Sequence, residues 1–483
     1  MTQPKTTVEL LREVAERHPD VDAFVTATGD RLSFGEWDRA ADGIAAGLAD
    51  RGVGPGDVVC LLMPSSPEYM VCYQAVMRLG AITTGINLRL GQAEVAHILD
   101  RTQPRVTVVD DGDGRGLPWA ELKSWWDANA PRLPALTTSQ PMLICWTGGT
   151  TGRPRGAVFD HENLKAVAQA TGVLSAQFDR RLSPIPFPHV GTMTRAWDEI
   201  SRVITTVITP VHWEAGETLR IIERERVTVA QGVPTQWELM LRHPALETTD
   251  LSSLRLAATG AGAVSADLLR RMRERVRVPV VNRYASTESG GVIAGTRPDD
   301  PDDVILNTVG RPSDGVEVRI VDEDGGVLPA DEVGRVQARS GAVMRGYWRD
   351  PDATVQVLDA EGWVTVGDLG RLDTDANLTL VGRVGDSYVR GGYNIYPAEV
   401  EGVLSDHPTV TEVAVVGVPD AVLGQIGVAF VVPAGALSED DLRAWVRARL
   451  ADYKVPDRVV AVEQMPMTSV GKIDKRALAV TAD

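Results

Sequence analysis

Cysteine is scarce in this chain, and long apolar runs are missing. The 483 residues include three cysteines, Cys60, Cys72 and Cys145, and none belongs to a CxxC pair. All three lie in apolar stretches, which predicts buried free thiols in a reducing compartment. No apolar run reaches the roughly 18 residues needed to span a bilayer, and the opening MTQPKTTVEL lacks the apolar core of a signal peptide. These absences predict a cytoplasmic protein without membrane insertion.

Positive charge is also in short supply. The chain has 49 Lys and Arg against 66 Asp and Glu, a formal net charge of −17. A nucleic-acid-binding protein needs a basic surface to contact phosphates, and an acidic protein is not attracted to anionic membranes. The charge balance therefore argues against nucleic acid as a partner and predicts an acidic, soluble surface.

Hydrophobic periodicity predicts strands that alternate with helices over the first 300 residues, which is typical of parallel sheets covered by helices. From about residue 304, short strands divided by Gly/Asp turns predict a small β-rich subdomain. The last hundred residues contain enough helices and strands for a small α+β domain. The predicted fold class is α/β, with an N-terminal domain over 1–382 (β-rich subdomain 304–382), a linker at 383–386 and a C-terminal domain over 387–483.

A run rich in glycine and threonine follows the strand predicted at 142–146. It reads Thr147, Gly148, Gly149, Thr150, Thr151, Gly152, and Arg155 follows shortly after. Glycines let backbone N–H groups converge on an anion, threonine hydroxyls add donors, and Arg155 adds a permanent positive charge. The run predicts a phosphate-binding loop, although not a Walker A loop, because GxxxxGK[ST] is absent. Taken alone, it also fits a flexible surface turn.

Four later segments carry residues suited to nucleotide chemistry. Residues 282–288 combine an aromatic with a carboxylate that can hold Mg²⁺, and an Asp follows a Gly turn at 362–368. Residues 382–401 contain a Gly/Arg-rich stretch, and 466–476 place a lysine after a Ser/Gly turn. Each segment alone is also typical of a plain turn or a solvated surface charge.

Taken together and in this order, the five segments resemble the adenylate-forming superfamily of acyl-CoA synthetases, carrier-protein adenylation domains and luciferase. The resemblance runs from about Thr7 to Leu478. It implies an enzyme that transfers AMP from ATP to a carboxylic acid, with Mg²⁺, and then passes the acyl group to an acceptor.

The resemblance also implies roles for individual residues in the ATP site. These are the β- and γ-phosphate loop (Thr147, Gly148, Gly149, Thr150, Thr151, Gly152, Arg155), the adenine loop (Ala261, Gly262, Ala263), the adenine-stacking Tyr284, the α-phosphate and Mg²⁺ contacts Thr287 and Glu288, the ribose ligands Asp368 and Arg383, and Lys472, the lysine of the adenylation step. In the chemistry implied, cations offset the repulsion between an anionic carboxylate and an anionic nucleotide.

For the second half-reaction, the resemblance implies that the C-terminal domain turns about a hinge at Gly385. Glycine eases the φ/ψ change that such a hinge requires. Gly391 and Gly392 fall where the family admits a pantetheine thiol, which favours coenzyme A as the acceptor. Monomer and homodimer both stay open.

The acid pocket implied by the resemblance involves His189, Met193, Trp197 and Ala285. Met193 and Trp197 are expected a turn apart on one helix, with Arg195 on another face as an outward surface charge. If Arg195 instead points inward, it would be placed to bind a second polar group of the acid.

Several positions depart from the family pattern: Gly149 replaces a usual Ser, Arg155 a Lys, Pro188 a Phe, and Gly385 an Asp or Lys. The leading hypothesis is an ATP-dependent acid:CoA ligase, whose acid is aliphatic or aromatic. The alternatives are transfer to a carrier protein, adenylation of an unusual oxyanion such as nitrite for transfer to an amine, and a non-catalytic nucleotide-binding homologue.

Overall fold

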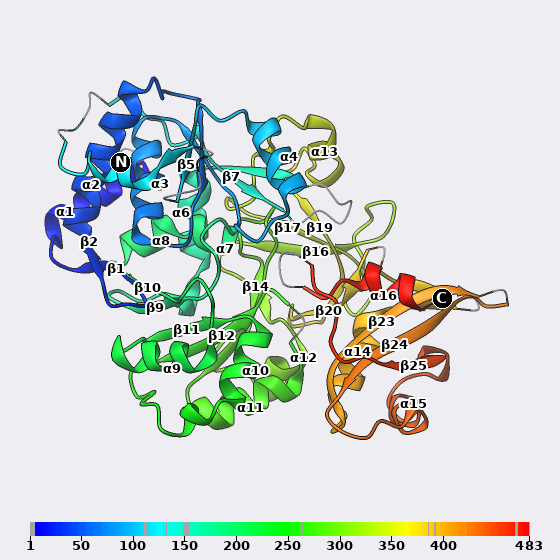
Figure 1. Cartoon of the computed structure of the whole chain (residues 1–483). Helices are drawn as coiled ribbons and strands as arrows, with labels where there is room; N and C mark the ends of the chain where they lie inside the picture. Colours follow the sequence, from blue (N-terminus) through cyan, green and yellow to red (C-terminus); the bar gives the residue numbers. More distant parts are fainter. Residues whose placement is uncertain are drawn as a thin grey trace.

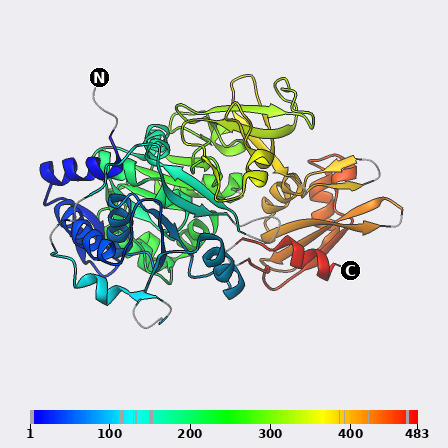
Figure 2. The ribbon, with the colours of Figure 1, turned by 90° about the horizontal axis from the view of Figure 1, so that it is seen from above.

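The computed structural model describes residues 5–110, 114, 116–128, 130, 133–147, 154–262, 264–384, 386–390, 393–420, 422–468 and 472–482. A large body formed by the first part of the chain lies beside a smaller C-terminal unit (Figure 1). Seen from above, that unit, orange to red, sits at one side of the body (Figure 2). The predicted α/β fold class, with a large N-terminal and a small C-terminal domain, is confirmed.

The first sheet of the body is mostly parallel. Its strands follow the order β15 (Arg311–Pro312), β14 (Ala294–Gly295), β13 (Val280–Tyr284), β12 (Leu256–Gly260), β11 (Val229–Gly232), β9 (Arg180–Ser183), β10 (Thr205–Ile208), β1 (Asp22–Val25), β2 (Arg31–Ser33). From β13 to β1 every neighbouring pair is parallel. The carboxyl ends of these strands therefore meet at one edge, where open α/β sheets bind ligands.

A second sheet lies beside the first. Its order is β18 (Gly346–Tyr347), β8 (Gly156–Asp160), β7 (Pro141–Trp146), β4 (Ile82–Gly85), β3 (Val58–Leu62), β5 (Val106–Val109), β6 (Leu117–Pro118). β7 and β8 are antiparallel neighbours, with Trp146 opposite Gly156. The segment predicted to bind phosphate therefore joins two adjacent strands.

Helices cover both sheets, as the sequence periodicity predicted. They are α1 (Thr7–Arg17), α2 (Phe34–Asp50), α3 (Pro67–Arg78), α4 (Gln92–Thr102), α5 (Trp119–Lys123), α6 (His161–Ala170), α7 (Val190–Met193), α8 (Ala196–Ser201), α9 (Ala215–Arg224), α10 (Pro234–Arg242), α11 (Ala266–Val276), α12 (Asp302–Asn307) and α13 (Pro351–Val357), with 3₁₀ turns η1 (Gly172–Leu174) and η2 (Pro244–Glu247).

Local sequence explains where the long helices begin. Thr6 with Glu9 and Ser33 with Glu36 form reciprocal capping boxes ahead of α1 and α2. The helices α1, α2, α3 and α8 bury their apolar faces in one large core, whereas α9, α10 and α11 cover the lower face of the first sheet in a separate core (Figure 1). The three cysteines are free and buried, as predicted.

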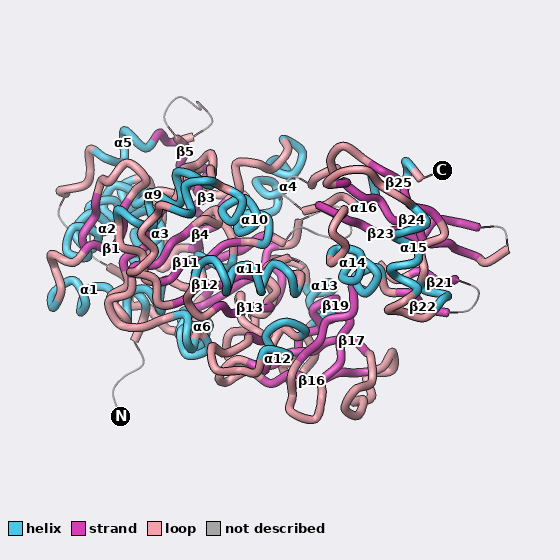
Figure 3. The backbone as a smooth tube through the Cα atoms, turned by 90° about the horizontal axis from the view of Figure 1, so that it is seen from below, coloured by secondary structure: helices cyan, strands magenta, loops and turns pink. Residues whose placement is uncertain are grey.

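The β-rich part follows the two sheets. An antiparallel sheet contains β16 (Glu317–Val321), β17 (Gly334–Arg339), β19 (Val364–Leu372) and β20 (Leu378–Arg383) in that order. Figure 3, coloured by secondary structure, shows its strands as a separate magenta group below the body. This sheet brings residues near 368 and 383 next to the end of β13.

The C-terminal unit has its own sheet and cores. Its elements are β21 (Tyr388–Arg390), β22 (Tyr393–Ile395), α14 (Pro397–Ser405), β23 (Val410–Asp420), β24 (Gly424–Pro433), α15 (Glu439–Arg447), η3 (Asp452–Lys454), β25 (Arg458–Ala461) and α16 (Lys475–Thr481). No helix among the described residues is long and apolar enough to cross a membrane.

Candidate active site

Tyr284, Asp368 and Arg383 form one hydrogen-bonded chain. Tyr284 ends β13, and its hydroxyl donates to Asp368 Oδ2 at 2.6 Å. The Arg383 Nε donates to Asp368 Oδ1 at 2.8 Å from the paired position on β20. Burial, and then the charge of Asp368, raise the pKa of Tyr284 well above its ordinary value, so its phenol stays neutral. The structure thus joins the predicted adenine-stacking residue to both predicted ribose ligands.

Lys472 reaches this group from the far end of the chain. Two hydrogen bonds to Thr468 hold its backbone: Thr468 N donates to Lys472 O at 2.7 Å, and Lys472 N donates to Thr468 Oγ1 at 3.2 Å. Partial burial, and then the positive charge of Arg383, lower the pKa of the Lys472 ammonium, while Asp368 raises it. The ammonium therefore lies within the field of the Asp368–Arg383 pair.

His189 belongs to the same neighbourhood. Burial, and then the charge of Lys472, lower the pKa of His189 to about 4. Its Nδ1 accepts from Gly191 N at 3.1 Å, which caps α7 and fixes the ring. The segment expected to border the acid and the segment expected to carry the lysine therefore meet in the structure.

The base of the predicted phosphate loop is closed by its own ends. Thr147 N donates to Arg155 O at 2.9 Å, and Arg155 N donates to Thr147 Oγ1 at 3.4 Å. The Arg155 guanidinium lies over the Tyr347 ring, 5.6 Å from its centroid. The Tyr347 hydroxyl in turn donates to Glu288 Oε1 at 2.8 Å. Tyr347 therefore connects the phosphate loop to the predicted metal-binding carboxylate.

Tyr347 is a residue that the sequence argument missed. It lies on the short edge strand β18, which pairs with β8 directly after the phosphate loop. Burial, and then Glu288, raise the pKa of its hydroxyl. The sequence carries no local signal for this role, because the partner Glu288 is about sixty residues away and only the fold joins the two.

The predicted adenine loop and the segment that contains Ala285 and Thr287 each follow the end of a strand, β12 and β13 respectively. Ala261 follows β12 in a left-handed conformation, with φ 61°, and Gly262 beside it is exposed. Thr287 lies in a turn in which its carbonyl accepts from Gly290 N at 3.0 Å. Ala285 is exposed directly after β13.

Some predicted residues lie outside the described part of the chain. They are Gly148, Gly149, Thr150, Thr151 and Gly152 of the phosphate loop, Ala263 of the adenine loop, the hinge residue Gly385, and Gly391 and Gly392 of the thiol channel. Their roles stay predictions.

Met193 and Trp197 both lie in the large core, but the prediction that one helix carries them is wrong. The chain forms two short helices, α7 and α8, that break at 194–195. Tyr69 and Tyr73 hold the end of α7, because their hydroxyls donate to Met193 Sδ at 3.4 Å and to Met193 O at 3.1 Å. The Tyr73 hydroxyl thus satisfies the carbonyl of Met193, one of the carbonyl groups left without a partner where α7 ends.

The expectation that Arg195 is an outward surface charge is also wrong. The residue is 8% exposed, and its Nη1 has no hydrogen-bond partner among the described residues. Burial, and then Arg181, lower its pKa to about 10, while Asp198 raises it. The sequence could not reveal this, because burial depends on tertiary packing: the compensating Asp198 is close in sequence, but the opposing Arg181 comes from β9.

A buried carboxyl accompanies this arginine. Burial raises the pKa of Glu199 to about 7, although Arg181, 3.7 Å away, opposes that change. Asp198 instead accepts from Arg181 at 2.9 Å, and its pKa is lowered, because the cations and hydrogen bonds around it outweigh burial. The interior behind α8 is therefore a charged network rather than a purely apolar wall.

Two family models match the chain. The model described as "AMP-binding enzyme" matches residues 11–348, and the model described as "AMP-binding enzyme C-terminal domain" matches residues 399–472. Between them these matches contain most of the residues of the site, including Tyr284, Glu288 and Lys472.

Known proteins similar to the chain cover nearly its whole length. It is 36% identical over 463 residues to feruloyl-CoA synthase of Amycolatopsis sp, covering 92% of this chain and 93% of that protein. It is 32% identical over 496 residues to indoleacetate–CoA ligase of Aromatoleum aromaticum, covering 96% of each. The solved structure of the amide bond synthetase McbA from Marinactinospora thermotolerans is also similar, with a TM-score of 0.87, 30% identity, and coverage of 99% of this chain and 100% of that one.

Proposed function

The chain belongs to the AMP-binding enzyme family, as its resemblance to the adenylate-forming superfamily predicted, and we propose that it is an ATP-dependent acid:CoA ligase. In the first step a carboxylate oxygen attacks the α-phosphorus of ATP, and the bond to pyrophosphate breaks. In the second step a thiol attacks the carbonyl carbon of the acyl-AMP, and AMP leaves with the electron pair of its acyl bond.

The convergence of Lys472 with the Asp368–Arg383 pair is the observation that carries this proposal. The charges of both paired residues act on the Lys472 ammonium, although it lies about ninety residues further along the chain. A cation held there offsets the repulsion between the incoming carboxylate and the nucleotide, and stabilises the charge that develops at the α-phosphate. We assign the adenylation step to Lys472 on that ground.

The hydrogen-bonded group of Tyr284, Asp368 and Arg383 would hold the ribose and base of ATP. Asp368 is paired with Arg383 and can accept from ribose hydroxyls through its remaining lone pairs. The Tyr284 ring, fixed through its hydroxyl, offers a flat face for adenine beside the exposed loop at Ala261 and Gly262. The hydrogen-bond geometry supports these roles, because it orients each group before the nucleotide arrives.

Glu288 fits the chemistry of a magnesium ligand. Among the described residues no group of three or more His, Cys, Asp or Glu side chains could hold a metal ion by itself. Mg²⁺ commonly takes one or two protein carboxylates together with substrate phosphates, and the ion would neutralise charge on the departing pyrophosphate. Tyr347 holds one oxygen of Glu288, which orients the carboxylate toward such a role.

The acid is proposed to be aromatic or of similar bulk and apolar character. Two relatives, feruloyl-CoA synthase and indoleacetate–CoA ligase, are named for aryl acids. Met193, whose N–H donates to His189 O at 3.1 Å, and Trp197 are buried in the large core and are proposed to provide apolar surface for such a group. Arg195, now placed inside, can contact a polar substituent through its unpartnered Nη1.

The domain boundaries are part of the proposal. Residues 1–382 would form the body with the ATP and acid sites, 383–386 the hinge, and 387–483 the lid that carries Lys472. In the described arrangement the charges of Asp368 and Arg383 act on Lys472, which is suited to the adenylation step.

Transfer to an amine is a second candidate for the acceptor step. The likeness to the amide bond synthetase McbA favours it. Both candidates share the first half-reaction and differ only in the nucleophile that attacks the acyl-AMP.

An ATP–pyrophosphate exchange screen over a panel of aryl and aliphatic acids tests the proposal. We expect exchange with at least one aryl acid, and loss of free thiol when coenzyme A is added with that acid. Exchange without thiol loss, together with amide formation from a supplied amine, would select the second candidate. No exchange with any acid would contradict adenylation itself.

A further inference from the structure

A pocket of about 260 Å³ lies behind the strand that carries Tyr284. Its walls come from β14, β15 and the turn at η1, and its charged lining residues are Arg283, Arg297, Arg311 and Asp314. Pockets for drug-sized ligands measure roughly 300–1,000 Å³. This one suits a small ion rather than a nucleotide.

Arg283 is the central cation of this pocket. Its Nη2 donates to Ser313 Oγ at 3.1 Å and, at a long 3.4 Å, to Ala170 O. No ion pair within 4 Å joins Arg283 to a carboxylate in the described part of the chain. A guanidinium has five donors in a planar fork that matches phosphate and carboxylate oxygens. Most of this donor capacity is left for a ligand.

The other charged residues do not neutralise Arg283. Arg311 forms an ion pair with the buried side chain of Asp300, so that carboxylate is not available to Arg283. Arg297 and Asp314 lie 4.0 Å apart and are largely exposed, which makes their pair weak. The charge of Asp314 raises the pKa of Arg283, but burial dominates and lowers it to about 10.

Gly295 makes room for the guanidinium. A Cβ at this position would lie 2.3 Å from Arg283 Nη1 and 2.8 Å from its Cζ. Gly295 is the residue on β14 directly opposite Arg283 on β13. Only a residue without a side chain lets the guanidinium lie flat against β14 and face the pocket.

The interior beyond the pocket adds to the excess of positive charge. The charges of both Arg181 and Arg283 lower the pKa of Arg195, behind the same strand. Of the nearby carboxyls, Asp198 is ionised but pairs with Arg181, and Glu199 has a pKa raised to about 7 and thus supplies only part of a negative charge at neutral pH. A bound anion would relieve this imbalance, because an unpaired cation is costly away from water.

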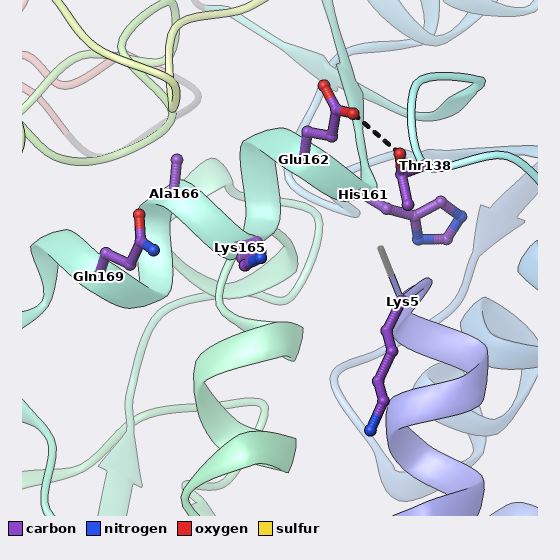
Figure 4. Close-up of a pocket in the computed structure, with 7 residues that line it drawn as sticks. All are labelled: Lys5, Thr138, His161, Glu162, Lys165, Ala166 and Gln169. Carbon is purple, nitrogen blue, oxygen red and sulfur yellow. Dashed lines mark hydrogen bonds between the residues drawn. The ribbon is translucent and has the colours of Figure 1, made fainter. Parts of the chain in front are cut away.

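A second pocket of about 290 Å³, drawn in Figure 4, provides a contrast. It lies between α6 and the start of α1. Its Lys5 pairs with Glu13, and the Thr138 hydroxyl donates to Glu162 Oε1 at 2.8 Å (Figure 4). Lys5, Thr138 and Glu162 of that pocket already have protein partners, whereas most donors of the Arg283 guanidinium have none among the described residues.

We propose that the pocket at Arg283 binds a phosphate group, either as inorganic phosphate or at the end of a small phosphate monoester. The Arg283 fork and the Arg297 guanidinium supply the donors, and Ser313 adds a hydroxyl. Successive residues of a strand face opposite sides of a sheet, so the phosphate lies across β13 from the Tyr284–Asp368 hydrogen bond. The site is separate from the predicted phosphate loop at 147–155.

Titration calorimetry with the full-length protein tests this site. Because phosphate can also enter the ATP site, the protein is first saturated with Mg²⁺ and α,β-methylene-ATP, and inorganic phosphate or glycerol phosphate is then titrated. The variants are Arg283→Gln, which removes the fork, and Gly295→Ala, which keeps the charge but displaces it. Arg220→Gln, an exposed arginine paired with Glu217 on α9, is the matched control. Circular dichroism verifies the fold of each variant. Should Arg283→Gln fail to fold, Arg297→Gln tests the site instead, because it alters an exposed side chain of the same pocket.

We expect one saturable site for at least one of the two phosphate compounds. Affinity should fall by about tenfold or more in Arg283→Gln and Gly295→Ala, in line with the loss of a charge-assisted pair, and less in Arg297→Gln. Arg220→Gln should bind like the original protein. The absence of saturable binding, or equal affinity in all the variants, would overturn the proposal.

Discussion

At the scale of single residues, Asp368 joins the most groups of the site. It accepts from Tyr284 and from Arg383, and its charge acts on Lys472. We expect Asp368→Asn to raise the KM for ATP by about tenfold or more, with a smaller change in kcat, because ribose and base would lose an oriented acceptor. Pyrophosphate exchange at varied ATP measures both constants.

Glu317→Gln offers a matched control in the same antiparallel sheet. Its carboxylate, on β16, pairs with Arg339 on β17 as Asp368 pairs with Arg383, but both of these side chains are exposed. This variant should keep the original KM. If both variants raise the KM equally, the effect comes from the sheet and not from the ribose site.

Tyr347 gives a prediction about magnesium. Tyr347→Phe removes the hydroxyl that donates to Glu288 Oε1. We expect the Mg²⁺ concentration for half-maximal exchange to rise about tenfold, since a hydrogen bond to a charged group contributes roughly 1.5–3 kcal/mol. A magnesium titration of the exchange rate checks this, and an unchanged magnesium requirement would remove Tyr347 from the metal site.

His161 makes stability depend on pH. This residue, drawn in Figure 4, is 1% exposed; its Nδ1 accepts from Thr7 N at 3.2 Å, and burial lowers its pKa from 6.5 to about 4. Between these values the unfolded chain binds a proton that the folded chain does not. The free energy of unfolding should therefore fall as the pH decreases from 6.5 to 4, by roughly 3 kcal/mol from this residue.

His161→Asn tests this contribution, because the amide oxygen can replace Nδ1 as acceptor without titrating. Urea unfolding at several pH values should show a shallower acid dependence in the variant. The exposed His212→Asn serves as control and should keep the original dependence. An equally steep acid loss in His161→Asn would contradict the assignment.

At the scale of elements, the linker between β20 and β21 carries the proposed hinge at Gly385. Proline fixes φ near −65°, so Gly385→Pro should restrict the turn of the C-terminal unit. We expect pyrophosphate exchange to persist while thioester formation slows by about tenfold or more. Gly435→Pro, in an exposed bend of the same unit where no atom lies within 4 Å of a Cβ, is the control. Equal loss of both half-reactions would argue against a hinge.

Most elements could be predicted from the sequence because their signals are local. Capping residues at Thr6 and Ser33 begin α1 and α2 as expected, and apolar runs locate the buried strands. The continuous helix expected through Met193 and Trp197 was wrong, and hydrogen bonds from Tyr69 and Tyr73 of α3 accompany the break at Met193. Packing from a distant element overrode local periodicity there.

The same distinction applies to the site. Tyr284, Asp368, Arg383 and Lys472 could be named from motifs, and the structure brings them together. Tyr347 could not, because its importance lies in a hydrogen bond to a distant residue. Arg195 was assigned to the surface because a lone charge on a short helix usually faces water. Its burial comes from tertiary packing, and only the fold brings Arg181 of β9 and Arg283 of β13, whose charges lower its pKa, close to it.

At the scale of the whole molecule, we propose that the body and the C-terminal unit contribute to one reaction centre. The body supplies Asp368, Arg383 and His189, and the C-terminal unit supplies Lys472, whose ammonium acts on the pKa of His189. A cation on a separate unit can be present for adenylation and withdrawn for thiol attack. In this proposal, the position of the C-terminal unit relative to the body decides which of the two half-reactions can take place.

Lys472→Ala tests this account most directly, with both half-reactions measured on the same protein. We predict that acid-dependent pyrophosphate exchange falls by at least about a hundredfold, as expected for loss of transition-state charge stabilisation, while thioester formation from supplied acyl-AMP largely survives. Lys475→Ala, which removes a neighbouring lysine paired with Glu401, should leave both steps intact. Unchanged pyrophosphate exchange in Lys472→Ala would contradict the account.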